Sequence, residues 1–210
     1  MLIIDISHTL DEQTPYYPGV TPTSLQQYKR LEADGFNAYS LTAGLHTGTH
    51  VDMPMHLTAD ARFANDFLPE RFIGEGRLLD VRGERVITMK PQYREIVREN
   101  DIVLLYTGFD AYYYAADYIA AHPVADIAFA DFLVERGVKM LGMDLPAPDK
   151  PPYAVHKRLL GNDIFVLENL TNLGMLVGKR FEVIALPLKL AAESSPVRAV
   201  CRILHPDEAR

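Results

Sequence analysis

One stretch decides how this chain is interpreted: His46-Thr47-Gly48-Thr49-His50-Val51-Asp52-Met53-Pro54-Met55-His56. It holds three of the seven histidines of the chain, with an aspartate between the second and the third. Histidine is the commonest protein ligand for metal ions, and scattered surface histidines do not usually gather so densely. We interpret the stretch as the first half of a divalent-metal site and as the chemical centre of the protein.

The spacing of His46 and His50 would align them on a helix, but their neighbours argue against one. Gly48 and the β-branched residues around it disfavour a helix, and the proline that follows blocks its continuation. A turn at Gly48 followed by an extended segment fits better. His50 and Asp52 then project to one side, with His46 folded back towards them. His56, beyond the proline, can approach the same pocket without binding metal.

The mixed nitrogen and carboxylate donors favour Zn²⁺, with Mn²⁺ as the alternative, and leave open whether one ion or two are bound. A site built on one loop needs closure from elsewhere, and the best candidates are His156 and Glu168. Glu168 ends an apolar run, where a carboxylate is costly to bury unless it is paired or metal-bound. The isolated histidines, His8, His122 and His205, are expected to be structural.

Composition limits the class of protein. With 210 residues, 48% of them hydrophobic, the chain is expected to form one domain over residues 1–210. The net charge is −7 and there is no basic stripe, so we expect a small-molecule substrate rather than nucleic acid or a membrane surface. The single cysteine, Cys201, fits a reducing cytoplasm. The N-terminus lacks signal-peptide features, and no apolar run approaches the roughly 20 residues of a membrane helix.

Short β-rich runs recur along the whole chain. Strands are predicted over 2–6, 37–43, 77–81, 102–106, 139–143, 164–167, 183–186 and 197–204. Helices are predicted over 91–98, 111–121 and 125–136. Strands outnumber helices without clean alternation, which favours an α/β fold of the mixed α+β type. The proline-rich segments 14–19 and 145–152 have the composition of ordered loops, where binding residues often lie.

The histidine stretch resembles the H-x-G-T-H-x-D-x-P-x-H signature of the bacterial cyclase family of metal-dependent hydrolases, which includes kynurenine formamidases and isatin hydrolases. The similarity covers essentially the whole chain, from the opening segment through the His156-to-Glu168 interval of twelve to the closing segments 185–190 and 195–200. It implies a compact fold of the swivelling β/β/α type, in which helices flank a β-barrel-like mixed sheet. It also implies a homodimer or higher homo-oligomer.

Carried over by position, the resemblance implies five metal ligands and one catalytic acid–base: His46, His50, Asp52, His156 and Glu168 as ligands, and His56 as the acid–base. It further implies that Asp52 can bridge two ions. Tyr17 stands where kynurenine formamidases carry a tryptophan, and this chain has no tryptophan. Tyrosine can still stack on an aryl ring of a substrate. Tyr16 and Phe63 are further candidates for the pocket walls.

These observations predict a metal-dependent hydrolase that cleaves a C–N amide bond with metal-activated water. The most concrete version is an arylformamidase that converts N-formylkynurenine to kynurenine and formate. The alternatives are a hydrolase of another cyclic amide or ester, isatin-like, and a non-catalytic metal-binding or small-molecule-binding protein. His56 favours an enzyme, because a binder has no use for an extra histidine beside its ligands. Serine-hydrolase chemistry is disfavoured, because the chain has no Gly-x-Ser-x-Gly motif.

Overall fold

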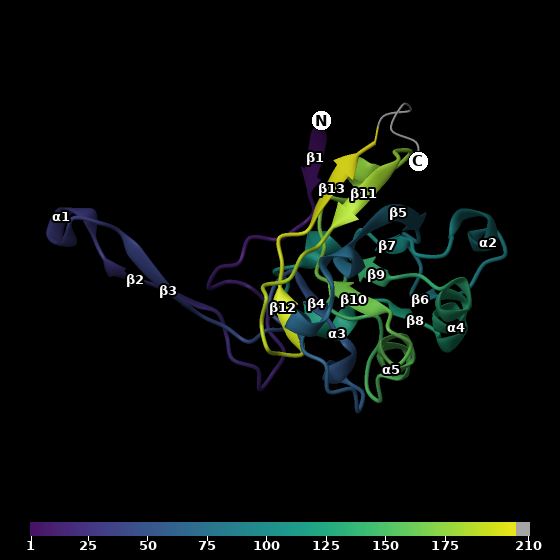
Figure 1. Cartoon of the computed structure of the whole chain (residues 1–210), viewed down its shortest axis with the longest axis horizontal. Helices are drawn as coiled ribbons and strands as arrows, with labels where there is room; N and C mark the ends of the chain where they lie inside the picture. The colour runs from purple at the N-terminus through teal and green to yellow at the C-terminus, as the bar shows by residue number, and fades with distance from the viewer. Residues whose placement is uncertain (205–210) are drawn as a thin grey trace.

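A mixed sheet of nine strands forms the centre of the structure, a computed structural model that describes residues 1–204. His205 lies outside the described residues. The strand order is β1-β13-β11-β5-β7-β9-β10-β4-β12 (Figure 1). The strands are β1 (Leu2–Asp5), β4 (His50–Asp52), β5 (Ile73–Asp80), β7 (Ile102–Tyr106), β9 (Met140–Met143), β10 (Phe165–Glu168), β11 (Phe181–Ile184), β12 (Ser194–Pro196) and β13 (Val200–Ile203).

The sheet combines a parallel centre with antiparallel flanks. Strands β5, β7, β9 and β10 are parallel to their neighbours in this group, and the remaining pairings are antiparallel. β7 is buried along almost its whole length, as expected of a central parallel strand with a continuous apolar sequence. The predicted mixed α/β architecture is therefore confirmed.

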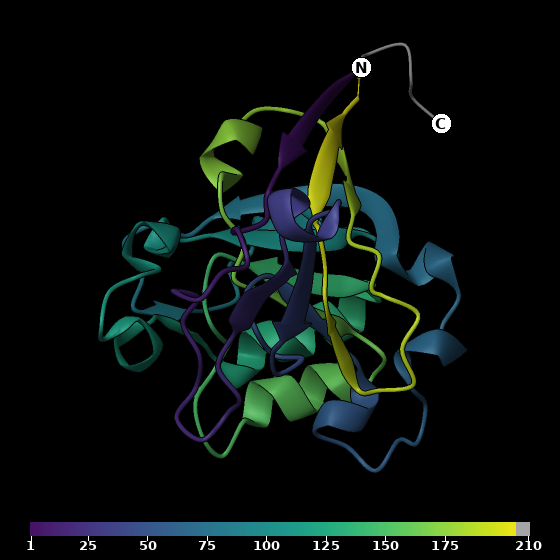
Figure 2. The same ribbon diagram turned by 90° about the vertical axis from the view of Figure 1, so that its left-hand side faces the viewer.

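The sheet curls where β5 changes partners. β5 pairs with β11 through residues 73–75 and with β7 through residues 76–80. Gly76 lies at this corner, and a Cβ there would fall 2.0 Å from the ring of Phe181, so only glycine leaves room for the ring. Figure 2 shows the result: β13, in yellow, runs steeply across the central strands in teal.

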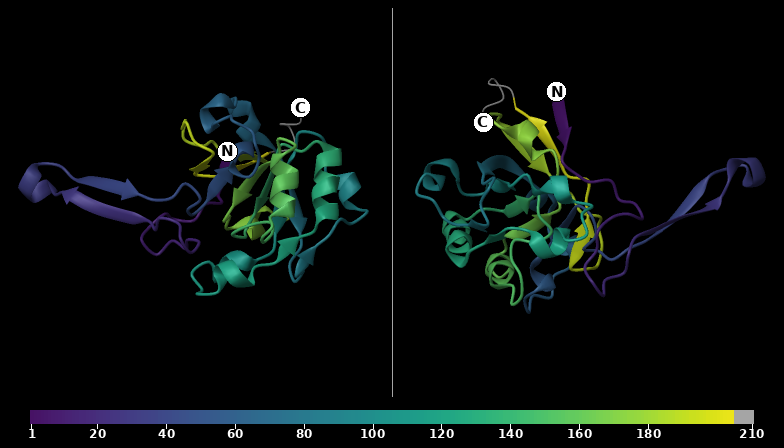
Figure 3. Two further views of the ribbon diagram at one scale, coloured as in Figure 1. Left: turned by 90° about the horizontal axis from the view of Figure 1, so that it is seen from below. Right: turned by 180° about the vertical axis from the view of Figure 1, so that it is seen from behind.

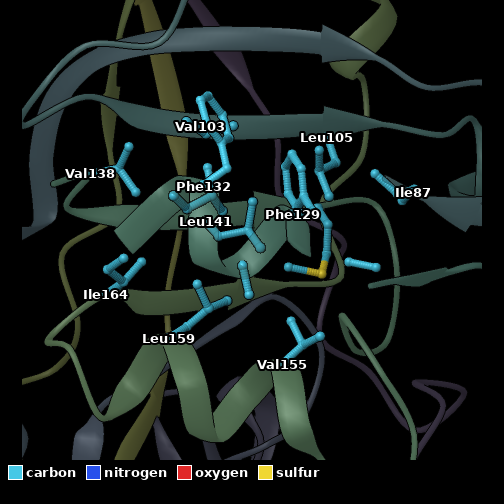
Figure 4. Close-up of a cluster of buried hydrophobic side chains, with 14 of the residues drawn as sticks. Ile87, Val103, Leu105, Phe129, Phe132, Val138, Leu141, Val155, Leu159 and Ile164 are labelled. Atoms are coloured by element: carbon cyan, nitrogen blue, oxygen red, sulfur yellow. The ribbon is translucent and has the colours of Figure 1, made fainter. Parts of the chain in front are cut away.

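Two helices cover one face of the parallel strands: α4 (Ile127–Arg136) and α5 (Ala154–Leu160). Phe129 of α4 and Leu159 of α5 pack with Leu141 of β9 in one buried cluster (Figure 4). A second buried cluster fills the other face of the sheet, inside the curl. α5 is held by this packing, and it carries one of the predicted metal ligands.

The predicted helices are only partly correct. Helix 125–136 starts at Ile127, because the Asp126 carboxylate caps it by accepting a hydrogen bond from the backbone of Phe129, at 2.8 Å. Segment 111–121 is helical only at its two ends, in a 3-10 turn over Phe109–Tyr112 and in one turn of α-helix over Tyr118–Ala121. The short helices are α2 (Tyr93–Ile96) and α3 (Tyr118–Ala121), and β6 (Val86–Ile87) pairs with β8 (Val124–Ala125).

The strand predictions find most of the sheet, with shifted ends. The run 197–204 is the clearest difference. Its first residues are not in a strand, because the chain leaves β12, which pairs with β4, before it enters β13, which pairs with β1 and β11. Within residues 1–204, no helix is both long enough and apolar enough to cross a membrane.

A two-stranded arm projects from the body of the molecule. It consists of β2 (Ser24–Lys29), the single helical turn α1 (Leu31–Asp34) and β3 (Ala38–Thr42), and β2 pairs only with β3 among the described residues. Figures 1 and 3 show the arm extending away from the sheet and helices. The sequence predicts β3, but it does not predict β2, whose residues are mostly polar.

Candidate metal centre

The loop that carries the first histidines folds as the sequence predicts. Gly48 has a left-handed backbone, with φ of 62°, which glycine adopts without strain. β4 follows, and His50 and Asp52, two residues apart on this strand, project to the same side. β4 is paired on both edges, with β10 and with β12, so these side chains are held in the interior of the protein.

Two other elements bring in the remaining predicted ligands. Glu168 is the last residue of β10, and His156 lies on α5. The five side chains form two groups, each with donor atoms within 4.8 Å of one another: His46, His50 and Asp52 in one, and Asp52, His156 and Glu168 in the other. Asp52 belongs to both groups. The structure therefore brings together all five residues that the sequence proposed as ligands.

The donor atoms of this cluster lie close together, and all but those of His46 are deeply buried. Nδ1 of His46 is 2.8 Å from Oδ1 of Asp52. Nε2 of His156 is 3.0 Å from Oε1 of Glu168. The carboxylates of Asp52 and Glu168 are almost completely buried. Because each buried charge costs several kcal/mol when it is not compensated, this pair of carboxylates needs positive charge beside it.

Nε2 of His50 shows that a metal ion fits this position. The atom is buried and makes no hydrogen bond within the described residues. It lies 3.3 Å from Oε2 of Glu168 and 3.5 Å from Oδ1 of Asp52. Nδ1 of the same ring donates to the carbonyl oxygen of Gly48 at 2.8 Å, so Nε2 is the nitrogen that can offer a lone pair to a metal ion. A buried nitrogen that faces two carboxylates without a hydrogen bond is costly, and a divalent cation between them would satisfy all three groups.

The other two histidines of the cluster also have partners on their outward-facing nitrogens. Nε2 of His46 lies 3.2 Å from Oε1 of Glu193, and Nδ1 of His156 lies 2.6 Å from Oδ1 of Asp149. Such partners orient histidine ligands in metal sites. Sequence reasoning missed both carboxylates. Asp149 lies in the proline-rich segment 145–152, whose composition was the available signal, whereas no pattern in the sequence marks Glu193.

His56 lies beside the cluster rather than in it. It ends a single 3-10 turn over Pro54–His56, and its side chain is 28% exposed. Its Nε2 is 3.9 Å from Oδ2 of Asp52, and its ring lies 4.1 Å from that of His46. Burial lowers the pKa of His56, which Asp52 only partly offsets. This position suits a group that exchanges protons at the edge of a site.

The charged groups of the cluster shift one another's pKa values. Burial works to lower the pKa of His46, but the carboxylates of Asp52, Glu168 and Glu193 together outweigh burial and raise that pKa to about 9. Burial works to raise the pKa of Asp52, but His46 and His50 outweigh it and hold that pKa below its ordinary value. The carboxylates therefore stay ionised, which is the form that binds metal.

A cavity of about 330 Å³ opens onto the cluster. Tyr17 forms part of its wall, and its hydroxyl donates to the carbonyl oxygen of Pro146 at 3.2 Å. Tyr153, which the sequence did not suggest, also lines it. Tyr16 and Phe63 are not among its lining residues, so the expectation that they form its walls is wrong. Tyr16 is instead 46% exposed.

His8 and His122 lie outside both ligand groups. The ring of His8 stacks on Tyr113, with centroids 3.6 Å apart. Nδ1 of His122 lies 2.7 Å from the carbonyl oxygen of Ile119. Both contacts are local packing and hydrogen bonding, in keeping with the structural roles that the sequence suggested.

Known proteins resemble this chain in sequence and in fold. Kynurenine formamidase from Bacillus cereus is 34% identical over 204 residues, which cover 95% of this chain and 96% of the relative. Isatin hydrolase A from Ralstonia solanacearum superposes with a TM-score of 0.87 at 22% identity, covering 95% of this chain and 91% of that one. A potential metal-dependent hydrolase with cyclase activity has a TM-score of 0.81 at 21% identity, covering 98% and 99%.

The family model described as putative cyclase matches residues 4–150, well over half of the chain. The match includes the whole histidine stretch and ends just after Asp149. The two structural likenesses, at identities below 25%, show the shared fold, while the formamidase relative extends the sequence similarity beyond the matched segment. On these grounds the chain belongs to the cyclase family.

Proposed function

We propose that this protein is a metal-dependent amidohydrolase and, most concretely, an arylformamidase that converts N-formylkynurenine to kynurenine and formate. The formamidase relative, alike over nearly the full length of both chains, supports this choice of substrate. We propose, with this substrate, a role in tryptophan degradation. The single buried thiol of Cys201 is in keeping with a reducing compartment, and we propose the cytoplasm.

The observation that carries the proposal is the buried cluster in which Asp52 belongs to two ligand groups. Its nitrogen and carboxylate donors favour Zn²⁺, with Mn²⁺ as the alternative. The sharing of Asp52 supports two ions rather than one. A divalent cation held by these residues would supply Lewis acidity, which polarises a carbonyl group and makes water more acidic near neutral pH.

The protein's own residues handle the proton and the substrate. His56, at the edge of the cluster, accepts the proton that the attacking water loses and returns it to the leaving nitrogen as the C–N bond breaks. Such acid–base assistance is typically worth about 10²–10⁴-fold in rate. The partly exposed position of His56 lets its ring reach both the cluster and the cavity. A protein that only stored metal would not need this side chain.

Tyr17 makes an isatin-like substrate the second candidate. Its ring forms part of the cavity wall, where it can stack on an aryl group. Its hydroxyl adds a polar group to the wall, already engaged with Pro146. A tyrosine at the position where formamidases carry tryptophan leaves the hydrolytic chemistry unchanged and alters the fit to the ring. Hydrolysis of a cyclic amide or ester is therefore the alternative activity of the same site.

A second copy of this chain is the partner that we propose, through the arm of residues 24–42. Five large apolar side chains on the arm are more than half exposed: Tyr28, Leu31, Phe36, Tyr39 and Leu41. A lone two-stranded hairpin is only marginally stable in water, and a cluster of exposed apolar side chains marks an interaction surface. Docking on a second copy would stabilise the hairpin and cover its exposed apolar side chains, and it would produce a homodimer.

The activity is tested with metal-stripped protein refilled with Zn²⁺ or Mn²⁺ and given N-formylkynurenine. We expect turnover that requires the metal. If the loaded protein leaves N-formylkynurenine intact but hydrolyses isatin, the second candidate replaces the first. If the loaded protein hydrolyses neither formamides nor cyclic amides or esters, the hydrolase proposal is wrong.

A further inference from the structure

Both carboxylate oxygens of Asp149 make hydrogen bonds to α5, the helix that carries His156. It lies in the proline-rich segment between β9 and α5 and is buried. Oδ2 accepts a hydrogen bond from the backbone N–H of Val155 at 2.7 Å. Oδ1 lies 2.6 Å from Nδ1 of His156. The residue therefore contacts both the backbone of α5 and the ring of one proposed metal ligand.

The first contact is structural. The residue that precedes α5 is Tyr153, whose backbone is left-handed, with φ of 60°, and whose side chain caps nothing. The first N–H groups of a helix need acceptors. Asp149 supplies one from outside the helix, so part of its role is to hold the start of α5 in place.

The second contact determines which nitrogen of His156 carries a proton. An ionised carboxylate only accepts hydrogen bonds, so Nδ1 of His156 is the donor. Nε2 lies 3.0 Å from Oε1 of Glu168, inside the cluster, so without metal it also carries a proton, and it is the nitrogen that releases its proton when a metal ion binds. We propose that Asp149 is a positioning residue that fixes the tautomer of His156 for metal binding. The inference rests on the proposed ligation of metal by His156.

Among the three histidines of the ligand groups, only His156 has its outward-facing nitrogen oriented by a buried carboxylate. His50 is oriented by a backbone carbonyl, which no substitution removes. Glu193, the partner of His46, is partly exposed, so water competes for it. Asp149 is shielded from water, and its hydrogen bond to an imidazole is correspondingly strong. His156 is therefore the ligand whose tautomer one substitution can reverse.

Asp149→Asn separates the two roles. The amide oxygen of asparagine can still accept from Val155, which keeps the start of α5 capped. The amide NH₂ then faces Nδ1 of His156, which must become an acceptor and move its proton to Nε2. That proton points at the metal position. We expect the dissociation constant for Zn²⁺, measured by competition with a chromophoric chelator, to rise about 10–100-fold.

A matched control is available at the other long helix. Asp126 caps α4 by accepting from Phe129 at 2.8 Å, and it contacts no proposed ligand. Asp126→Asn makes the same chemical change at a helix start. We expect it to leave Zn²⁺ affinity unchanged. If Asp149→Asn and Asp126→Asn weaken Zn²⁺ binding equally, or if neither weakens it, the positioning role of Asp149 is wrong.

Two further measurements keep the test decisive. In the wild-type protein loaded with Zn²⁺, ¹⁵N spectra of labelled histidines should show His156 protonated at Nδ1, a result that requires no variant to fold. Protonation at Nε2 would overturn the inference. His156→Ala should weaken Zn²⁺ binding. If His156→Ala binds Zn²⁺ normally, both the proposed ligation and the inference about Asp149 are wrong. If His156→Ala weakens Zn²⁺ binding but Asp149→Asn does not, only the inference about Asp149 is wrong.

Discussion

Glu168 lies directly opposite His50 across the antiparallel pair of β10 and β4, with Oε2 of the glutamate 3.3 Å from Nε2 of the histidine. Residues paired in this way across two strands have neighbouring side chains on one face of the sheet. The register of two strands far apart in the sequence therefore brings two of the proposed ligands of the candidate metal centre together. A slip of one residue would turn Glu168 to the opposite face and dismantle it.

Asp52→Asn should remove metal from both ligand groups, because Asp52 is the only side chain that they share. Losing the orienting partner of a ligand already costs about 10–100-fold in metal affinity, so losing a shared ligand should cost at least about 100-fold. Metal content measured by mass spectrometry should fall with activity. Asp80→Asn, at an exposed carboxylate on β5, is the control, and full metal content in Asp52→Asn would contradict the shared site.

His56→Ala should lower kcat by about 10²–10⁴-fold and leave the metal content unchanged, because His56 lies outside both ligand groups. Both kcat and the metal content are measured on the same preparation of the variant. Loss of metal in this variant would make His56 a ligand instead of the acid–base. If His56→Ala keeps full activity, His56 is not the acid–base and another residue transfers the proton.

Gly76→Ala should destabilise the fold by about 1–3 kcal/mol, because its Cβ would fall 2.0 Å from the ring of Phe181 at the corner of the sheet. Denaturant unfolding measures the change. Phe181→Leu removes the ring, so the double variant should be destabilised by less than the sum of the two single variants. Additive effects would show that the two residues do not collide.

Burial raises the pKa of the Cys201 thiol from 9.0 to about 12. Between these values the folded protein keeps the thiol proton and the unfolded chain loses it. Stability should therefore fall as pH rises through this window, by up to about 1.4 kcal/mol per pH unit relative to Cys201→Ala. Thiol reagents should modify Cys201 only at the rate of unfolding. Rapid modification of the native protein would contradict this burial.

Replacing Tyr39 and Leu41 together by serine should shift the protein from dimer to monomer, since both apolar side chains are exposed on the arm. Light scattering after size-exclusion chromatography measures the mass. Met175→Ser removes a comparably exposed apolar side chain from the body of the protein and should leave the mass unchanged. A wild-type protein that is monomeric at high concentration would rule out the proposed partner.

The amino-acid sequence by itself determined the parts of this protein that depend on neighbours along the chain. Gly48 allows the turn, and the alternation along β4 places His50 and Asp52 on one side, so half of the ligand cluster could be read directly. The apolar run of β7 matched its predicted bounds because a strand buried on both faces has a continuous apolar sequence. The family signature added the distant ligands, His156 and Glu168.

Only the tertiary structure decided how the distant parts meet. The pairing of β10 with β4 brings Glu168 to His50, and the packing of α5 sets His156 beside Asp149. The arm is a further example, because the mostly polar β2 is recognised as a strand only through its pairing with β3. Local sequence patterns fix turns and side-chain direction through sterics and hydrogen bonds between near neighbours. Register and packing depend on contacts between segments far apart in the chain, and these exist only in the folded protein.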